Sequence, residues 1–126
     1  MLKKIILWFE KHYILSIIIA ILIAIFIFYM SSQSFEKGTP VEFPFKTIAY
    51  HFLVFSSLAF FLSVSLVGKT KNRYFVLIAV LITISYGILD ELHQLFVINR
   101  YCSLDDAFVD SFGIIITNLF YILIRN

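Results

Sequence analysis

The sequence predicts an all-α membrane protein with four transmembrane helices. Of its 126 residues, 61% are hydrophobic and only 14% are Asp, Glu, Lys or Arg, whereas a soluble domain is about half apolar and about a quarter charged. The apolar residues also form four long runs. At about 1.5 Å per residue, each run can cross a hydrocarbon core of about 30 Å. We therefore expect a single membrane domain over residues 1–126.

The first expected span covers residues 13–30. It follows a lead-in that carries three lysines and Trp8, a composition typical of the cytoplasmic or interfacial flank of a membrane helix. The apolar run is longer than the core of a signal peptide, which is about 7–15 residues, and no A-x-A cleavage pattern follows it. We therefore expect an uncleaved helix.

The remaining spans are expected at residues 46–67, 74–98 and 104–124. The polar stretch between the first two spans holds one glycine and two prolines, which argues against a regular helix there. Short turns at 68–73 and 99–103 predict that spans three and four form an antiparallel hairpin. Gly87 and Gly113 are expected where these two helices touch, because small residues let helices approach closely.

The distribution of basic residues predicts the orientation. With the N-terminus in the cytoplasm, seven of the ten Lys and Arg residues flank the inner side and three flank the outer side, as the positive-inside rule requires. Both termini are therefore expected in the cytoplasm and the 99–103 turn outside. This topology places most of the unusual polar residues at the outer ends of the four spans.

Five of the eight acidic residues fall within residues 86–113. Ionisable groups in a membrane span are costly and indicate a functional site by default. The catalytic candidates are Asp90, Glu91, His93 and Asp110. Asp90 and His93 lie three residues apart and so share a helix face, where a carboxylate can orient an imidazole. An equal alternative is a polar network that only holds helices together. Glu91 points about 100° away from Asp90 on a helix.

The start of the fourth span has two interpretations. Ser103 followed by Asp106 resembles a capping box, and acidic residues in a first turn are favoured by the helix dipole. A structural role is therefore the stronger interpretation for Asp105 and Asp106. Asp110 lies beyond the first turn on the same face as Asp106, where capping does not explain it, and a functional role is favoured.

The ligand-binding candidates are Arg100, Gln94, His51, Lys46, Asp106, Ser32 and Gln33. The planar guanidinium of Arg100 suits a phosphate or carboxylate, and Lys46 is the alternative anion holder. An outer lysine is also an ordinary interfacial residue, and a lone histidine such as His51 is more often a packing residue. No spacing motif supports a metal site, so no metal or cofactor is expected. A metal site formed by His51, His93 and the carboxylates is the alternative. The net charge of +2 and scattered basic residues indicate no nucleic-acid partner.

With these residues in hand, the chain resembles the VanZ-like family of bacterial membrane proteins. The resemblance covers most of the chain and extends upstream to Ser31–Ser34 and His51-Phe52. In that family Pro-Gly often precedes the arginine, where this chain has Ile98-Asn99. The residues that carry the resemblance are Tyr86-Gly87, Asp90-Glu91, His93-Gln94, Phe96, Arg100, Ser103, Asp105-Asp106, Asp110 and Gly113.

The resemblance implies a small multi-pass protein of the bacterial cytoplasmic membrane. The founding member of the family is associated with resistance to the glycopeptide teicoplanin. Three functions are expected. The first is an outer-leaflet pocket that binds an anionic lipid or lipid-linked headgroup and alters glycopeptide access. The second is an enzyme that modifies such a lipid by Asp, Glu or His acid–base chemistry. The third is a structural or partner-binding subunit. The oligomeric state is left open.

Overall fold

The computed structural model describes residues 1–34, 44–100 and 102–126, and its regular elements in these ranges are helices. The four predicted spans are confirmed as helices long and apolar enough to cross a membrane. A shorter helix precedes them. The helices are α1 (Leu2–Lys11), α2 (Tyr13–Ser31), α3 (Pro44–Thr70), α4 (Phe75–Gln94) and α5 (Leu104–Arg125).

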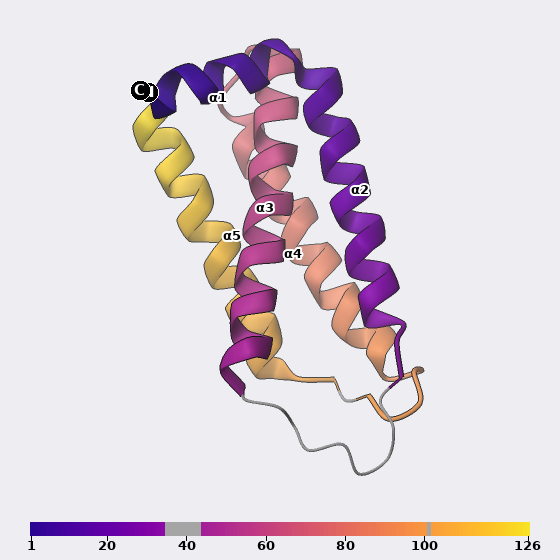
Figure 1. Cartoon of the computed structure of the whole chain (residues 1–126). Coiled ribbons are helices and arrows are strands. Elements are labelled where there is room, and N and C mark those ends of the chain that lie inside the picture. The colour runs from indigo at the N-terminus through magenta and orange to yellow at the C-terminus, as the bar shows by residue number, and fades with distance from the viewer. Residues whose placement is uncertain (35–43, 101) are drawn as a thin grey trace.

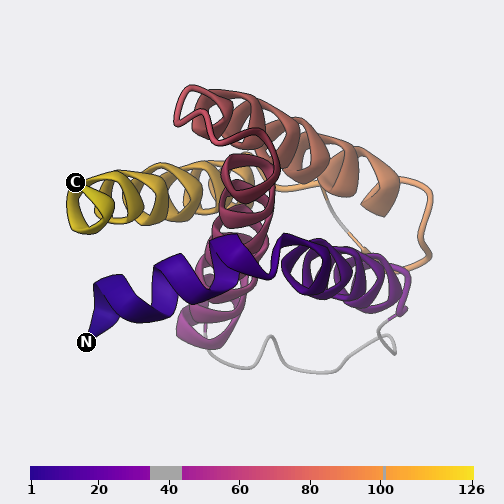
Figure 2. The same ribbon diagram turned by 90° about the horizontal axis from the view of Figure 1, so that it is seen from above.

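Helix α3 lies at the centre of the bundle and contacts each of the other four helices. Helix α1 lies across one end, where both chain termini meet (Figures 1 and 2). There the Lys3 ammonium donates a hydrogen bond to the backbone oxygen of Asn126 at 3.2 Å. The bundle therefore has two different ends, one covered by α1 and one formed by the opposite ends of the four long helices.

The core is apolar and the outer surface is also apolar. Phe55 of α3 packs with Ile27 of α2 and Ile114 of α5 in the centre of the bundle. On the outside, side chains such as Leu77 and Leu123 are more than half exposed. The exposed apolar side chains of this bundle are suited to contact with lipid. Its backbone is suited to the membrane as well, because a helix satisfies its own hydrogen bonds where water is absent.

A buried glutamate fastens α1 to the rest of the bundle. Glu10 accepts hydrogen bonds from the Tyr121 hydroxyl at 2.6 Å and from Arg125 Nε at 2.7 Å. Gly68 of α3 allows this close approach, because an added Cβ would clash with the backbone oxygen of Glu10. The sequence pattern did not single out Glu10, since one acidic residue among lysines on a short helix resembles a solvated side chain.

Helices α4 and α5 form the predicted antiparallel hairpin (Figure 1). Helix α4 ends at Gln94, earlier than the predicted span end at residue 98. Beyond it, Leu95, Phe96 and Val97 donate their N–H groups to the carbonyl three residues back, which tightens the chain into turns. Asn99 then adopts φ 61°, a left-handed conformation that asparagine tolerates better than most residues.

The expectation for the two glycines is half correct. Gly87 lies against Asp110 of α5 and Phe55 of α3, as a contact within the hairpin requires. Gly113 instead faces α3, where an added Cβ would meet Ser56 Oγ at 2.7 Å and the Phe52 carbonyl oxygen at 3.0 Å. The prediction that Gly113 lies against α4 is therefore wrong, because the central helix takes that close approach.

Candidate functional site

The polar residues of the predicted site gather at the end of the bundle opposite α1. Helix α3 supplies His51, α4 supplies Asp90 and Glu91 from its last turns, and α5 supplies Asp110. The end of α2 adds Ser31 and Ser32. All four residues supplied by α3, α4 and α5 are buried. Four helices thus place polar side chains together where the sequence predicted them.

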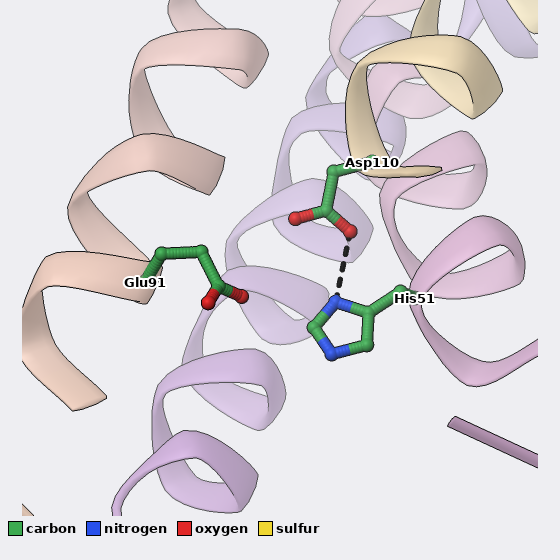
Figure 3. Close-up of side chains that lie close together, drawn as sticks. All are labelled: His51, Glu91 and Asp110. Carbon is green, nitrogen blue, oxygen red and sulfur yellow. Dashed lines mark hydrogen bonds and ion pairs between the residues drawn. The ribbon is translucent and has the colours of Figure 1, made fainter. Parts of the chain in front are cut away.

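His51 lies between two carboxylates of α5. Its Nδ1 is 2.9 Å from Asp110 Oδ1, and its Nε2 is 3.6 Å from Asp106 Oδ2. The spacing explains this, because residues four apart on a helix share a face and can meet the two nitrogens of one ring. His51 is 5% exposed and Asp110 only 1%, so the pair is buried. Figure 3 shows the contact between the two side chains.

Glu91 completes the cluster from α4. Its side chain points toward His51 and Asp110 (Figure 3), and one ligand atom from each of the three residues lies within 4.8 Å of the others. Glu91 Oε2 accepts the Ser103 N–H at 2.9 Å. In the part of the chain that the structure describes, Glu91 Oε1 and Asp110 Oδ2 are buried without a hydrogen-bond partner. Such atoms are rare in folded proteins and call for an explanation.

The predicted capping box forms only in part. Ser103 caps α5, because its hydroxyl accepts the Asp106 N–H at 3.3 Å. The reciprocal bond of a capping box would lead from the Ser103 N–H to the Asp106 carboxylate. The Ser103 N–H goes to Glu91 instead, and the Asp106 carboxylate faces His51. The backbone N–H of Asp106 therefore takes part in the helix cap, and its carboxylate belongs to the polar cluster.

A second group of contacts joins α4 to α2. The Asp90 carboxylate faces the Ser31 side chain, and His93 Nε2 lies 3.1 Å from Ser32 Oγ. The His93 ring stacks on Phe28 with ring centroids 4.8 Å apart. Asp90 and His93, on one face of α4, thus face the successive serines Ser31 and Ser32 at the end of α2. Asp90 and Glu91 face different partners, as their helical spacing predicted.

The other candidates take different positions. Gln94 is buried, Arg100 is half-buried in the connection after α4, and Lys46 is exposed near the start of α3. Gln33 is exposed just beyond α2, and its amide donates to the Tyr29 carbonyl in the last turn of that helix at 3.1 Å. The structure therefore does not bring Gln33 into the cluster.

Tyr50 is a polar residue of this end that the sequence reasoning missed. Its hydroxyl oxygen is buried and has no hydrogen-bond partner within the described ranges, and its ring lies edge-on to His51 with centroids 5.5 Å apart. The only feature of the sequence that could have indicated Tyr50 as a site residue is its position next to His51. In a chain with 7 tyrosines, that indication is weak.

Fold and site together define a multi-pass α-helical membrane protein with a buried histidine–carboxylate cluster at one end of its four-helix bundle. The model of one protein family, VanZ/LLP1, matches residues 16–125. The chain belongs to the VanZ/LLP1 family, and the expected resemblance is confirmed. Comparisons with curated proteins and with solved structures found no match.

Proposed function

We propose that this chain is a bacterial cell-envelope protein that binds the polar headgroup of a lipid or lipid-linked precursor at the outer leaflet. The observation that carries the proposal is the pair of buried oxygens without partners, Glu91 Oε1 and Asp110 Oδ2. Leaving one buried acceptor unsatisfied costs about 1–3 kcal/mol. A ligand that supplies hydroxyl or amine donors, or a bound cation, would recover that cost.

The distribution of charge supports an outer location for the cluster. Three basic segments all lie at the α1 end of the bundle (Figure 1): α1 itself, the last turn of α3 with its connection to α4, and the end of α5. Seven of the ten Lys and Arg residues belong to these segments. By the positive-inside rule that end faces the cytoplasm, and the cluster then faces outward.

Two features favour a lipid over a small soluble ligand. A shallow, open apolar depression lies on the exposed side of α4, lined by Leu81, Ile82, Ser85, Tyr86 and Leu89. An acyl chain against this surface would place its headgroup near Asp90, which lies one turn beyond Tyr86 on the same side of α4. Lys46 and Arg100 at the same end supply positive charge for the anionic part of a headgroup.

Binding of this kind would affect the cell envelope. A protein that holds a lipid-linked precursor changes how much of that precursor is accessible at the outer surface. We extend the proposal to susceptibility to glycopeptides such as teicoplanin, which reach the envelope from that side. The proposed partners of the chain are therefore the lipid bilayer and an anionic lipid headgroup.

The second candidate is an enzyme that modifies such a lipid. The buried His51–Asp110 pair at 2.9 Å favours it, since a carboxylate that fixes an imidazole is the usual arrangement of a general base. Glu91, and Asp90 with His93, offer further acid–base groups, and the buried Tyr50 hydroxyl offers a proton donor. This chemistry would leave a modified lipid in the membrane.

One experiment separates the candidates. Lipids and lipid-linked precursors would be profiled in cells that express the wild type, Glu91→Gln or Asp105→Asn, and on the purified proteins. A binder enriches an intact lipid on the purified wild type and on Asp105→Asn, but not on Glu91→Gln. An enzyme produces a new lipid species that Glu91→Gln lacks. If the three folded proteins give identical profiles in both measurements, the proposal fails and the cluster serves structure or a partner protein.

A further inference from the structure

The cluster at the outer ends of α3, α4 and α5 has the composition of a metal site. It combines one imidazole with two carboxylates, all buried, and two of the carboxylate oxygens have no hydrogen-bond partner in the described structure. Buried charges in proteins are paired or coordinate metals. We propose that His51, Glu91 and Asp110 together bind one divalent transition-metal ion.

The geometry requires modest movement for an ion to bind. The three ligand atoms lie within 4.8 Å of one another. Two ligands at about 2.0–2.2 Å from a tetrahedral Zn²⁺ are about 3.3–3.6 Å apart. Side-chain rotations that move the ligand atoms by about 1 Å are therefore enough. The contact between His51 and Asp110 at 2.9 Å would open slightly as both atoms turn to a shared ion.

The surroundings orient these ligands as a metal site requires. A metal-bound histidine usually donates its other ring N–H to a carboxylate or carbonyl, which fixes the ring and its tautomer. With Nδ1 on the ion, Nε2 of His51 faces Asp106 Oδ2 at 3.6 Å, so a small shift of either side chain would bring this pair within hydrogen-bond length. Glu91 is held in the same way, because its Oε2 accepts the Ser103 N–H. Its other oxygen remains directed to the cluster.

The donor set also indicates which ion binds. Carboxylates alone suit Mg²⁺ or Ca²⁺, whereas an imidazole favours Zn²⁺ and other transition metals, with Mn²⁺ accepting both. Zn²⁺ and Mn²⁺ are therefore the best matched ions. Three protein ligands leave at least one coordination position open. A phosphate oxygen of the headgroup would occupy it, and this last point alone rests on the proposed function.

The sequence did not predict this site. Metal motifs are recognised by ligands at short, regular spacing, whereas these three residues come from three separate helices. His51 in particular is one histidine in a long apolar run. Only the packing of α3 against α5 and α4 brings the ligands together.

The direct test is metal binding by the full chain in detergent, without lipid. Elemental analysis of protein purified without chelators should find one Zn²⁺ or Mn²⁺ per chain. After chelation, titration with Zn²⁺, Mn²⁺ and Mg²⁺ should show a single site that binds Mg²⁺ most weakly. A folded wild-type chain that binds none of these ions at up to 100-fold molar excess would overturn the proposal.

Variants locate the site. Asp106→Asn removes the negative charge that faces His51 Nε2, so it should weaken binding by about 10–100-fold, and Glu91→Gln should weaken it more. Asp105→Asn, an exposed neighbour on the same helix, should bind as the wild type does. Asp106 is partly exposed, with 20% of its side chain accessible, so its variant should fold even if changes at His51 do not. Equal affinity in Asp106→Asn, Glu91→Gln and wild type would place the ion elsewhere and refute the site.

The role of the ion is tested separately. Lipid capture by the purified chain would be compared with Zn²⁺ and with chelator. If the ion bridges to phosphate, chelation should abolish capture. Stoichiometric metal without lipid capture would contradict the proposed function and leave the metal site standing. Equal lipid capture with Zn²⁺ and with chelator would refute the proposal that the ion bridges the protein to phosphate.

Discussion

Replacing Glu91 by glutamine should make the empty protein more stable. The carboxylate is 3% exposed, and Oε2 accepts the Ser103 N–H while Oε1 has no partner in the described structure. In Glu91→Gln the amide oxygen can keep the Ser103 bond. The amide NH₂ then occupies the position of Oε1 and offers a donor toward the cluster, where Asp110 Oδ2 is an acceptor without a partner.

The expected gain follows from these two atoms. One unsatisfied buried acceptor is removed and a second can gain a donor, and each such group costs about 1–3 kcal/mol. The substitution also removes one of two neighbouring carboxylates. We therefore expect the free energy of unfolding to rise by about 1–3 kcal/mol. A site that is kept for function at the expense of stability behaves in this way.

The assay is reversible unfolding in mixed micelles with a chelator present, so that no bound ion stabilises the wild type. Asp105→Asn is the control and should leave stability nearly unchanged. A decrease of 1 kcal/mol or more in the free energy of unfolding of Glu91→Gln would refute the reasoning. It would show that the Glu91 carboxylate stabilises the packing of the helices in the protein without ligand.

Two further predictions concern the opposite end and the topology. Gly68→Ala should lower the free energy of unfolding by about 1–3 kcal/mol, the usual cost of overpacking, because the new Cβ would clash with the Glu10 backbone oxygen. Unfolding in micelles measures this change, and a variant as stable as the wild type would contradict the packing of α1 against α3. Exposed Cys102 should react with an impermeant thiol reagent in intact cells, whereas Lys69→Cys in a Cys102→Ala background should react only after lysis. The reverse pattern would invert the orientation.

The sequence predicts the number and approximate limits of the spans because a run of apolar residues long enough for the bilayer has few alternatives. It also predicts which end of the bundle is polar, because Asp90, Glu91 and Asp110 lie at corresponding ends of two antiparallel helices. Family membership followed from the same residues. These inferences depend on position along the chain, which the sequence states directly.

The rotation of each helix about its axis is harder to predict from the sequence. A span that is hydrophobic on all sides has no polar face to mark its outside, so nothing showed that His51 faces Asp110 or that Gly113 faces α3. The burial of Glu10 was hidden for a related reason, because its partners Tyr121 and Arg125 lie at the far end of the chain. Such pairings are decided by packing between helices.

Lipid capture tests the headgroup site most directly. Wild type, Glu91→Gln and Asp105→Asn would be purified from the same membranes, and their bound lipids released and identified by native mass spectrometry. We expect one lipid or lipid-linked class to be enriched on the wild type and on Asp105→Asn and to be lost from Glu91→Gln. The same bulk membrane lipids on all three folded proteins would contradict the existence of a headgroup site at this end of the bundle.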